Sequence, residues 1–250
     1  MNSQQINWLK SIPVAHRGLH SAEEQIIENS KKAFENAIRH GYAIELDAQV
    51  IADGEVVVFH DYNLERVCGI NEDVSELRTS DLTRFPFKGS TENIPLLKDV
   101  LAFVNGQVPL LIEIKKQSGV RHANMIILNS LLGYKGAFAI QSFDPFILGW
   151  FAKNAPLICR GQLSSDFKDI PMNRLLKYLL KTFKFNFISK PNFLAYNITD
   201  MPNRVIDRKR RQGLPVIVWT VTSETEQARI SPFCDNIIFE LFQPKITDTE

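Results

Sequence analysis

Acidic side chains alternate with apolar ones in one short segment of the sequence. Glu45 and Asp47 are interleaved with Ile44 and Leu46. Because successive side chains of a strand point to opposite faces, both carboxylates lie on the same face. Two like charges at this spacing repel each other, and a cation bound between them removes the repulsion. Carboxylate oxygens are ligands that Mg²⁺ and Ca²⁺ prefer, so the spacing predicts a divalent-metal site. A solvated acidic strand end is the alternative.

The same alternation recurs at Glu113 and Lys115, which follow the apolar residues 109–112. A buried strand has no packing use for two charges, so we expect Glu113 to join Glu45 and Asp47 in one cluster. Lys115 then offers a compact positive charge to a phosphate oxygen. A surface ion pair between Glu113 and Lys115 is the alternative.

Two histidines also follow apolar runs. His16, with Arg17 and Gly18, comes directly after residues 12–15, and His60 comes after residues 56–59. An imidazole exchanges protons near neutral pH, and a guanidinium binds phosphate oxygens. Each histidine alone is equally compatible with a surface, capping or packing role. The combination of imidazoles, carboxylates, one Arg and one Lys at strand ends indicates metal-assisted phosphoryl chemistry.

The elements that must hold these side chains alternate between short apolar runs and segments of helical period. This pattern is typical of a parallel sheet with crossover helices. We expect eight strands, with an extra strand at residues 55–59 joined to the second through a turn at Asp53 and Gly54. The eight lie near residues 12–15, 43–50, 110–114, 137–140, 157–160, 186–188, 216–219 and 236–239.

A chain of 250 residues matches the length of one eight-stranded βα barrel. We therefore predict the α/β class, with a single (βα)8 TIM-barrel domain over residues 1–250. The irregular residues 61–93 are interpreted as a small insertion subdomain after the second strand hairpin, because Gly69, Pro86 and Gly89 interrupt any regular period there.

Composition argues against several classes of protein. The chain has 44% hydrophobic and 23% charged residues and a formal net charge of +1, so no global field attracts nucleic acid or an anionic membrane. Residues 1–12 lack the pattern of a secretory signal, and no apolar run is long enough to span a bilayer. Cys68, Cys159 and Cys234 are odd in number and widely spaced, which favours reduced thiols and a cytoplasmic location.

Two further segments are compatible with other partners. The basic residues 208–211 are best interpreted as a solvated helix face, so no nucleic-acid partner is expected. Residues 175–193, rich in Leu, Phe and Lys, suit an amphipathic lip that touches a membrane. An outer helix that packs on the sheet and is followed by a strand is the commoner arrangement, so membrane contact is not expected.

The ordered motifs resemble those of the glycerophosphodiester phosphodiesterases, of the bacterial cytoplasmic type. The matches run from about residue 12 to residue 221. They comprise His16-Arg17-Gly18, Glu28-Asn29-Ser30, Glu45-Leu46-Asp47, Asp53-Gly54, His60-Asp61, Ile94-Pro95-Leu96, Glu113-Ile114-Lys115, Gln141-Ser142-Phe143 and Val218-Trp219-Thr220-Val221. The resemblance implies a (βα)8 barrel that hydrolyses glycerophosphodiesters to glycerol 3-phosphate and an alcohol.

The resemblance also implies roles for individual residues. Glu45, Asp47 and Glu113 would bind one divalent metal ion, Mg²⁺ or Ca²⁺. His16 and His60 would form the acid and base pair. The metal would neutralise phosphodiester charge while one histidine takes a proton from the nucleophile and the other protonates the leaving alkoxide.

Four further residues would contact the substrate. Arg17 and Lys115 would hold the phosphate. Asn29 would either hydrogen-bond the site or cap the first helix, because Asn is a favoured N-cap residue. Trp219 would form a wall for the glycerol or simply plug the barrel mouth.

Two other functions remain open at this point. The first is a lysophospholipase D-type enzyme, which would use the same site on lysophospholipids. The second is a non-catalytic barrel that binds glycerol phosphates. The head group of the substrate, the choice between Mg²⁺ and Ca²⁺, the nucleophile, the histidine that acts first as base and the oligomeric state do not follow from residue types.

Overall fold

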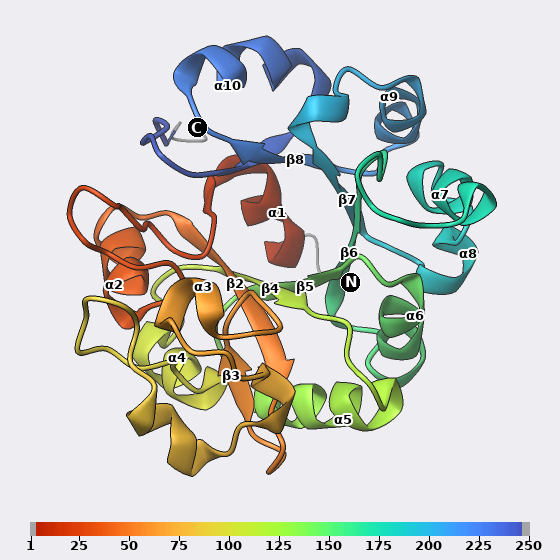
Figure 1. The fold of residues 1–250 in the computed structure, drawn as a ribbon. Helices are drawn as coiled ribbons and strands as arrows, with labels where there is room; N and C mark the ends of the chain where they lie inside the picture. Colours follow the sequence, from red (N-terminus) through yellow and green to blue (C-terminus); the bar gives the residue numbers. More distant parts are fainter. Residues whose placement is uncertain (1–3, 247–250) are drawn as a thin grey trace. The chain divides into compact units, whose positions relative to one another are not determined.

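A computed structural model of the chain describes residues 4–246. Parallel strands alternate with helices along the chain, and the fold is a (βα)8 barrel, as predicted (Figure 1). The chain divides into two compact units, Ala15–Ala137 and Met1–Val14 with Phe138–Glu250. Strand β1 (Val14–Ala15) lies at the boundary between them.

The unit Ala15–Ala137 holds the strands that carry the predicted carboxylates. Its elements are α2 (Lys31–Arg39), β2 (Ala43–Val50), β3 (Val56–Val58), α3 (Glu65–Cys68), the 3₁₀ turns η1 (Val74–Glu76) and η2 (Thr79–Arg84), α4 (Leu97–Val104), β4 (Leu110–Ile114) and α5 (Val120–Leu131). β2 pairs with β4 in parallel, and Asp47 lies opposite Glu113. β3 pairs with β2 antiparallel, which confirms the predicted hairpin.

Helix α2 begins directly after Ser30. The Oγ atom of Ser30 accepts a hydrogen bond from the backbone N–H of Ala33 at 3.1 Å, so Ser30 is the N-cap. Ala33, Phe34 and Ala37 recur at helical spacing and form its buried face. This packing fixes the start of α2 close to the turn that follows β1.

The predicted insertion consists of short helical turns with a hydrophobic cluster of its own. Leu64, Val74, Leu82 and Phe87 are buried in this cluster together with Val57 of β3. The insertion is therefore anchored on the β2–β3 hairpin.

The other unit contains the remaining strands and their helices. Its elements are α1 (Gln4–Ser11), β5 (Phe138–Ser142), α6 (Pro145–Asn154), β6 (Cys159–Ser164), α7 (Arg174–Lys181), α8 (Asn186–Ser189), β7 (Phe193–Asn197), η3 (Ile198–Asp200), α9 (Arg204–Arg211), β8 (Val216–Val221), α10 (Glu224–Ile230), η4 (Ser231–Phe233) and β9 (Asn236–Phe239). Strands β5 to β9 pair with their neighbours in parallel, in the order of the chain. Among residues 4–246, no helix combines the length and apolar character needed to cross a bilayer.

One strand prediction was wrong and another was displaced. Residues 186–188 form part of helix α8, and the strand lies at Phe193–Asn197. The strand predicted at residues 157–160 is β6, which runs from Cys159 to Ser164. A Cβ on Gly161 would lie 2.1 Å from the ring of Phe193, so this strand needs a glycine where sequence patterns favour an apolar residue.

Candidate active site

Three carboxylates meet on the paired strands β2 and β4. The side chains of Glu45, Asp47 and Glu113 are buried, and one oxygen from each lies within 4.8 Å of the others. The parallel register that sets Asp47 opposite Glu113 brings the two strands' carboxylates together, and the alternation along β2 adds Glu45. The structure thus assembles the cluster that the spacing predicts.

Burial and mutual repulsion disfavour the charged forms of two of these groups. Burial, followed by the charges of Asp47 and Glu113, raises the pKa of Glu45 well above its usual range. Burial also raises the pKa of Glu113. For Asp47 the penalty of burial is outweighed by Lys115, His60 and Arg17, whose charges lower its pKa to about 2. Such perturbed carboxyl groups in one buried cluster are typical of functional sites.

Two cationic side chains partly neutralise the cluster. The Nζ atom of Lys115 lies 2.9 Å from Glu113 Oε1 and 3.3 Å from Asp47 Oδ1. The backbone N–H of Arg17 donates to Glu45 Oε2 at 2.9 Å, and Arg17 Nε lies 3.6 Å from Asp47 Oδ2. With every group ionised, three carboxylates against two cations leave one net negative charge.

The donor set fits a divalent cation. The oxygens are hard ligands that Mg²⁺ and Ca²⁺ prefer, and both ions favour carboxylates over nitrogen or sulfur donors. A divalent ion would convert the excess negative charge of the cluster into one positive charge. That charge equals in magnitude the single negative charge of a phosphodiester.

The backbone around Arg17 adopts the left-handed conformation at three residues. Arg17 has φ = 54°, Gly18 has φ = 79° and Asn29 has φ = 55°. A Cβ on Gly18 would lie 2.8 Å from the Cβ of Ala33, so only glycine fits beside helix α2. The N–H of Asn29 donates to the carbonyl of Arg17 at 2.8 Å. Unusual φ values in non-glycine residues are tolerated where surrounding contacts hold them, and they gather at functional sites.

Asn29 contacts the cluster directly. Its Nδ2 donates to Asp47 Oδ2 at 2.9 Å, while Ser30 is the residue that caps α2. Of the two roles considered for Asn29, the structure thus shows the contact with the site. Among the described residues, its buried Oδ1 has no hydrogen-bond partner, which leaves an acceptor available in the polar interior.

His60 lies just beyond β3 and is oriented by the next residue. Its Nδ1 is 2.6 Å from Asp61 Oδ1. Because a carboxylate only accepts hydrogen bonds, Nδ1 carries the proton, and Nε2 of the neutral ring is left to exchange one. Burial, together with the charges of Lys115 and Arg17, lowers the pKa of His60 against the opposing effects of Asp47 and Asp61. His60 is therefore biased toward the neutral form.

Arg66 of helix α3 connects two loops through residues that sequence reasoning missed. Its Nη1 and Nη2 donate to the two carboxylate oxygens of Glu28, at 2.8 and 2.6 Å. Its Nε donates to Asp61 Oδ2 at 2.6 Å. Glu28 in turn accepts from Arg17 Nη1 at 2.7 Å. A chain of charged hydrogen bonds thus runs from Arg17 through Glu28, Arg66 and Asp61 to His60.

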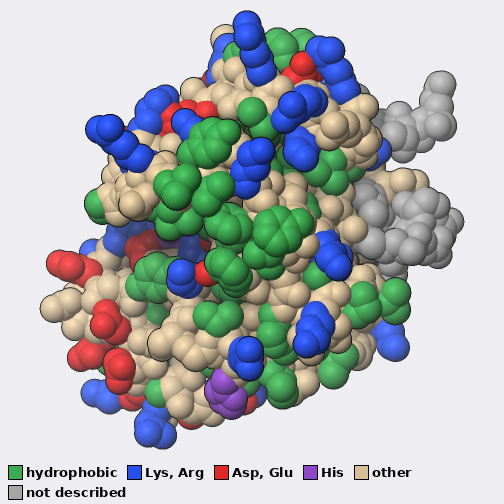
Figure 2. All heavy atoms as spheres, turned by 90° about the vertical axis from the view of Figure 1, so that its right-hand side faces the viewer, with side chains coloured by type: hydrophobic (Ala, Val, Ile, Leu, Met, Phe, Trp, Pro, Cys, Tyr) green, Lys and Arg blue, Asp and Glu red, His purple; other side chains and the backbone are tan. Residues whose placement is uncertain are grey.

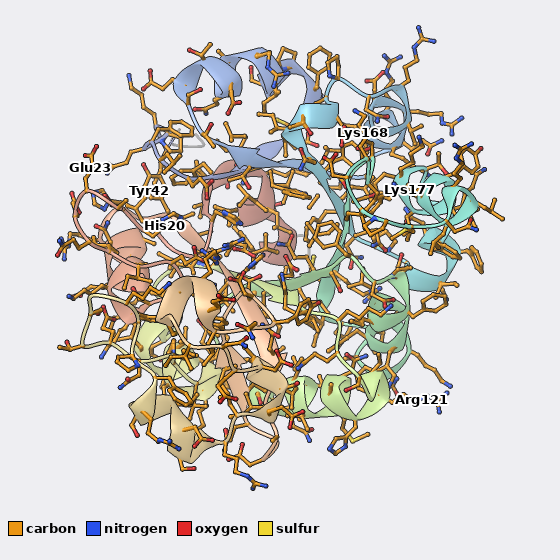
Figure 3. All side chains as sticks on the ribbon, viewed as in Figure 1. His20, Glu23, Tyr42, Arg121, Lys168 and Lys177 are labelled. Atoms are coloured by element: carbon orange, nitrogen blue, oxygen red, sulfur yellow. The ribbon has the colours of Figure 1, made fainter. Side chains whose placement is uncertain are left out.

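The sequence gives different indications for Glu28, Asp61 and Arg66. Glu28 and Asp61 stand within the quoted motifs, beside Asn29 and His60, but neither spacing nor residue type indicated their contacts. Arg66 lies in the irregular insertion, where no periodicity points to it. A pocket of about 410 Å³ lies beside these hydrogen-bonded residues and is lined in part by His20, Glu28, Arg66 and Lys88. His20 is labelled in Figure 3.

The last two predicted residues are placed as follows. His16 stands directly after β1, one residue before Arg17. Trp219 lies on β8 in the other unit, where its ring packs edge to face on Phe143 with 5.5 Å between ring centroids. Phe143 packs in the same manner on Phe167 at 6.3 Å. The choice between a substrate wall and a plug for Trp219 stays a prediction.

Known proteins resemble this chain over most of its length. The model of the Glycerophosphoryl diester phosphodiesterase family matches residues 16–234. A human lysophospholipase D, GDPD1, is 27% identical over 254 residues, which cover 86% of this chain and 78% of that protein. A glycerophosphodiester phosphodiesterase of Caldanaerobacter subterraneus is 26% identical over 237 residues, covering 89% and 90%.

Solved structures show the same fold. A glycerophosphodiester phosphodiesterase from Thermotoga maritima matches with a TM-score of 0.71 at 25% identity, over 91% of this chain and 94% of that chain. A phosphodiesterase from Oleispira antarctica, solved with the product sn-glycerol-3-phosphate, matches with a TM-score of 0.78 at 18% identity, over 94% of each chain. The predicted family resemblance and the predicted barrel are both confirmed.

Proposed function

Because the chain belongs to the glycerophosphoryl diester phosphodiesterase family, we propose that it hydrolyses glycerophosphodiesters to glycerol 3-phosphate and an alcohol with the help of one divalent metal ion. The observation that carries the proposal is the buried cluster of Glu45, Asp47 and Glu113, with Arg17 and Lys115 beside it. Neither a core nor a surface needs three buried acids so close together.

The residues of this cluster divide into two groups. Glu45, Asp47 and Glu113 hold the cation, which when bound neutralises phosphodiester charge and polarises a phosphoryl oxygen. Arg17 and Lys115 hold non-bridging phosphate oxygens, which stabilises the charge that builds up in the transition state. Their preformed contacts with the cluster mean that neither cation has to reorganise during the reaction.

The two histidines move the protons. His60, kept neutral by its lowered pKa and held by Asp61, has Nε2 available to take a proton from the nucleophile. His16 then donates a proton to the leaving alkoxide. The assignment follows from the electrostatics of His60, and each histidine is expected to contribute about 10²- to 10⁴-fold in rate.

The test is a coupled assay for glycerol 3-phosphate, with glycerophosphocholine and glycerophosphoethanolamine as substrates. We expect activity that EDTA abolishes and that added Mg²⁺ or Ca²⁺ restores. His60→Ala should lose most of the activity, while His122→Ala, a change of the same type at an exposed position of α5, should keep it. Full activity in EDTA, or in His60→Ala, would overturn the proposed mechanism.

A second substrate class has one observation in its favour. The human relative that matches 86% of this chain is named a lysophospholipase D. Hydrolysis of lysophosphatidylcholine at a rate comparable to that of glycerophosphocholine would establish this activity, and a failure to release choline from lysophosphatidylcholine would exclude it.

The proposed location is the cytoplasm. Cys68, Cys159 and Cys234 are all buried free thiols, and burial raises the pKa of each. Buried cysteines without disulfides suit a reducing compartment. Fractionation of cells that produce the protein tests this location, and recovery only outside the cytoplasm would contradict it.

A further inference from the structure

Helix α7 exposes apolar side chains that the described residues leave uncovered. None of its residues is buried. Leu175 is 65% exposed and Tyr178 is 50% exposed, and Phe187 of the adjoining helix α8 is 72% exposed. The sequence predicted a helix with its apolar side packed on the sheet, followed directly by a strand. Instead, α7 presents apolar side chains to solvent, and α8 separates it from β7.

Helix α6 extends this surface and gives it a firm base. Phe146, also exposed, has its ring 5.8 Å from that of Phe185. A Cβ on Gly149 would lie 2.7 Å from Ile188 Cγ2, so α6 and α8 pack at a distance that only glycine permits. On this side of the molecule, hydrophobic side chains gather with Lys and Arg side chains around them (Figure 2). The apolar surface therefore lies on packed helices rather than on a loose loop.

The same segment is strongly basic. Residues 170–190 contain no Asp or Glu and five cationic residues, whereas the whole chain has a net charge of only +1. The five are Arg174, Lys177, Lys181, Lys184 and Lys190.

On α7 the two kinds of side chain occupy different sides. Arg174, Lys177 and Lys181 recur at helical spacing along one side, and leucines and Tyr178 occupy the rest of the circumference. Lys177 is labelled on α7 in Figure 3. The surface is thus apolar with a cationic edge.

We propose that α7, with the adjoining face of α6 and α8, docks on the surface of an anionic phospholipid membrane. An amphipathic helix with Lys and Arg along one side and Leu and aromatic residues along the other binds at the headgroup boundary of a bilayer. The cations attract anionic headgroups, and the aliphatic stems of lysine cover apolar surface while the ammonium groups stay in water. A membrane of zwitterionic lipid has no net negative surface charge to attract these cations.

Helix α7 is tied to the strand that precedes it in the chain. The Oγ of Ser164, the last residue of β6, donates to the carbonyl of Leu180 at 3.2 Å. This bond ties α7 to the carboxyl end of β6. Membrane binding itself needs no turnover, so this inference stands or falls separately from the proposed function.

The test is co-sedimentation of the full chain with vesicles of phosphatidylcholine alone and with vesicles of phosphatidylcholine and phosphatidylglycerol. We expect binding to the mixed vesicles, weakening with added salt, and little binding to the neutral ones. The pair Lys181→Gln and Lys184→Gln should lower the partition coefficient by roughly 25-fold, because each cation at an anionic surface contributes roughly 5-fold. Arg204→Gln with Arg208→Gln makes the same change of charge on α9 and should have an effect below about twofold.

A second variant pair tests the apolar contribution. Leu175→Ser with Tyr178→Ser alters only exposed side chains, so far-ultraviolet circular dichroism should be unchanged while binding to mixed vesicles is lost. The proposal is overturned if the wild-type chain does not bind mixed vesicles, if it binds neutral vesicles equally, or if the Arg204 and Arg208 pair weakens binding as much as the Lys181 and Lys184 pair does. If the Leu175→Ser with Tyr178→Ser variant still binds mixed vesicles, but differs from the wild-type chain in sedimentation coefficient when no vesicles are present, this face is instead a contact with a second copy of the chain.

Hydrolysis of soluble glycerophosphocholine by the same preparations separates the two proposals. The variants of the proposed membrane surface should keep the wild-type rate on this substrate. Vesicle binding without hydrolysis would contradict only the proposed function, and hydrolysis without vesicle binding would contradict only the membrane proposal.

Discussion

Replacing Asp61 by asparagine tests whether the carboxylate beside His60 sets the protonation of that ring. In the wild type, Asp61 accepts from His60 Nδ1 through one oxygen and from Arg66 Nε through the other, both at 2.6 Å. In Asp61→Asn one of these positions becomes an NH₂ donor. If the NH₂ faces His60, Nδ1 must accept, and the proton moves to Nε2. If the NH₂ faces Arg66, two donors meet and the loop contact is lost.

Either arrangement removes a neutral His60 with a well-placed Nε2 acceptor. Losing the residue that orients a functional histidine costs about 10- to 100-fold, and loss of the histidine itself sets the limit at about 10⁴-fold. We therefore expect kcat/KM for glycerophosphocholine to fall by about 10- to 100-fold, which is about 1.4–2.8 kcal/mol of transition-state stabilisation.

The pH profile separates this role from a structural one. The hydrogen bond that His60 donates to Asp61 raises the pKa of His60, so its loss should move the acid limb of kcat/KM to lower pH. Asp81→Asn, at an acid that pairs with Arg84 at 3.2 Å in the same insertion, is the matched control and should leave rate and profile unchanged. A rate within twofold of the wild type, or an acid limb displaced to higher pH, would refute the reasoning.

Three other outcomes are expected. The wild-type acid limb of kcat/KM should lie below pH 6.5, because the folded environment lowers the pKa of His60 from that value and its base form is lost as the pH falls through the lowered pKa; a limb above 6.5 in a pH–rate series would contradict this. Mg²⁺ or Ca²⁺ at about 100 times its Kd should raise the free energy of unfolding by about 2.7 kcal/mol in urea titrations. The Asp47→Asn variant should not show this stabilisation. An equal stabilisation of that variant would mean that the ion binds elsewhere. Gly18→Ala should lower the free energy of unfolding by about 2–5 kcal/mol, because it adds an overlap with Ala33 to an unfavourable φ, while Gly89→Ala, with a similar φ and open space, should cost only about 1–2 kcal/mol; equal costs in urea titrations would show that the overlap is relieved.

The parts of the site that lie on regular strands could be predicted from the sequence. The strands at 43–50 and 110–114 have the predicted bounds, because charged residues interrupt their apolar runs with a period of two. The same period places Glu45 and Asp47 on one face, and parallel pairing brings Glu113 to them. Local pattern was sufficient here because every relevant side chain stands on a strand.

Contacts made by irregular segments could not be predicted in this way. Arg66 and Glu28 are 38 residues apart, and no periodicity relates a residue of the insertion to one before α2. The strand predicted at residues 186–188 was misplaced because these Phe- and Ile-containing residues have strand-like composition, yet they form helix α8 against α6. The contacts of Arg66 depend on tertiary structure that no local pattern encodes, and at residues 186–188 tertiary packing overrides a local preference.

Arg66 donates hydrogen bonds to both Glu28 and Asp61, which affects how the insertion and the segment before α2 open. One guanidinium holds Glu28, before helix α2, and Asp61, at the start of the insertion, so neither segment can detach without breaking charge-assisted hydrogen bonds to the other. The two segments should therefore fluctuate as one cooperative unit, with their backbone amides exchanging hydrogen for deuterium at a common rate. An opening that frees the insertion would release Arg17 and His60 together, so that the proposed site is lost in a single event.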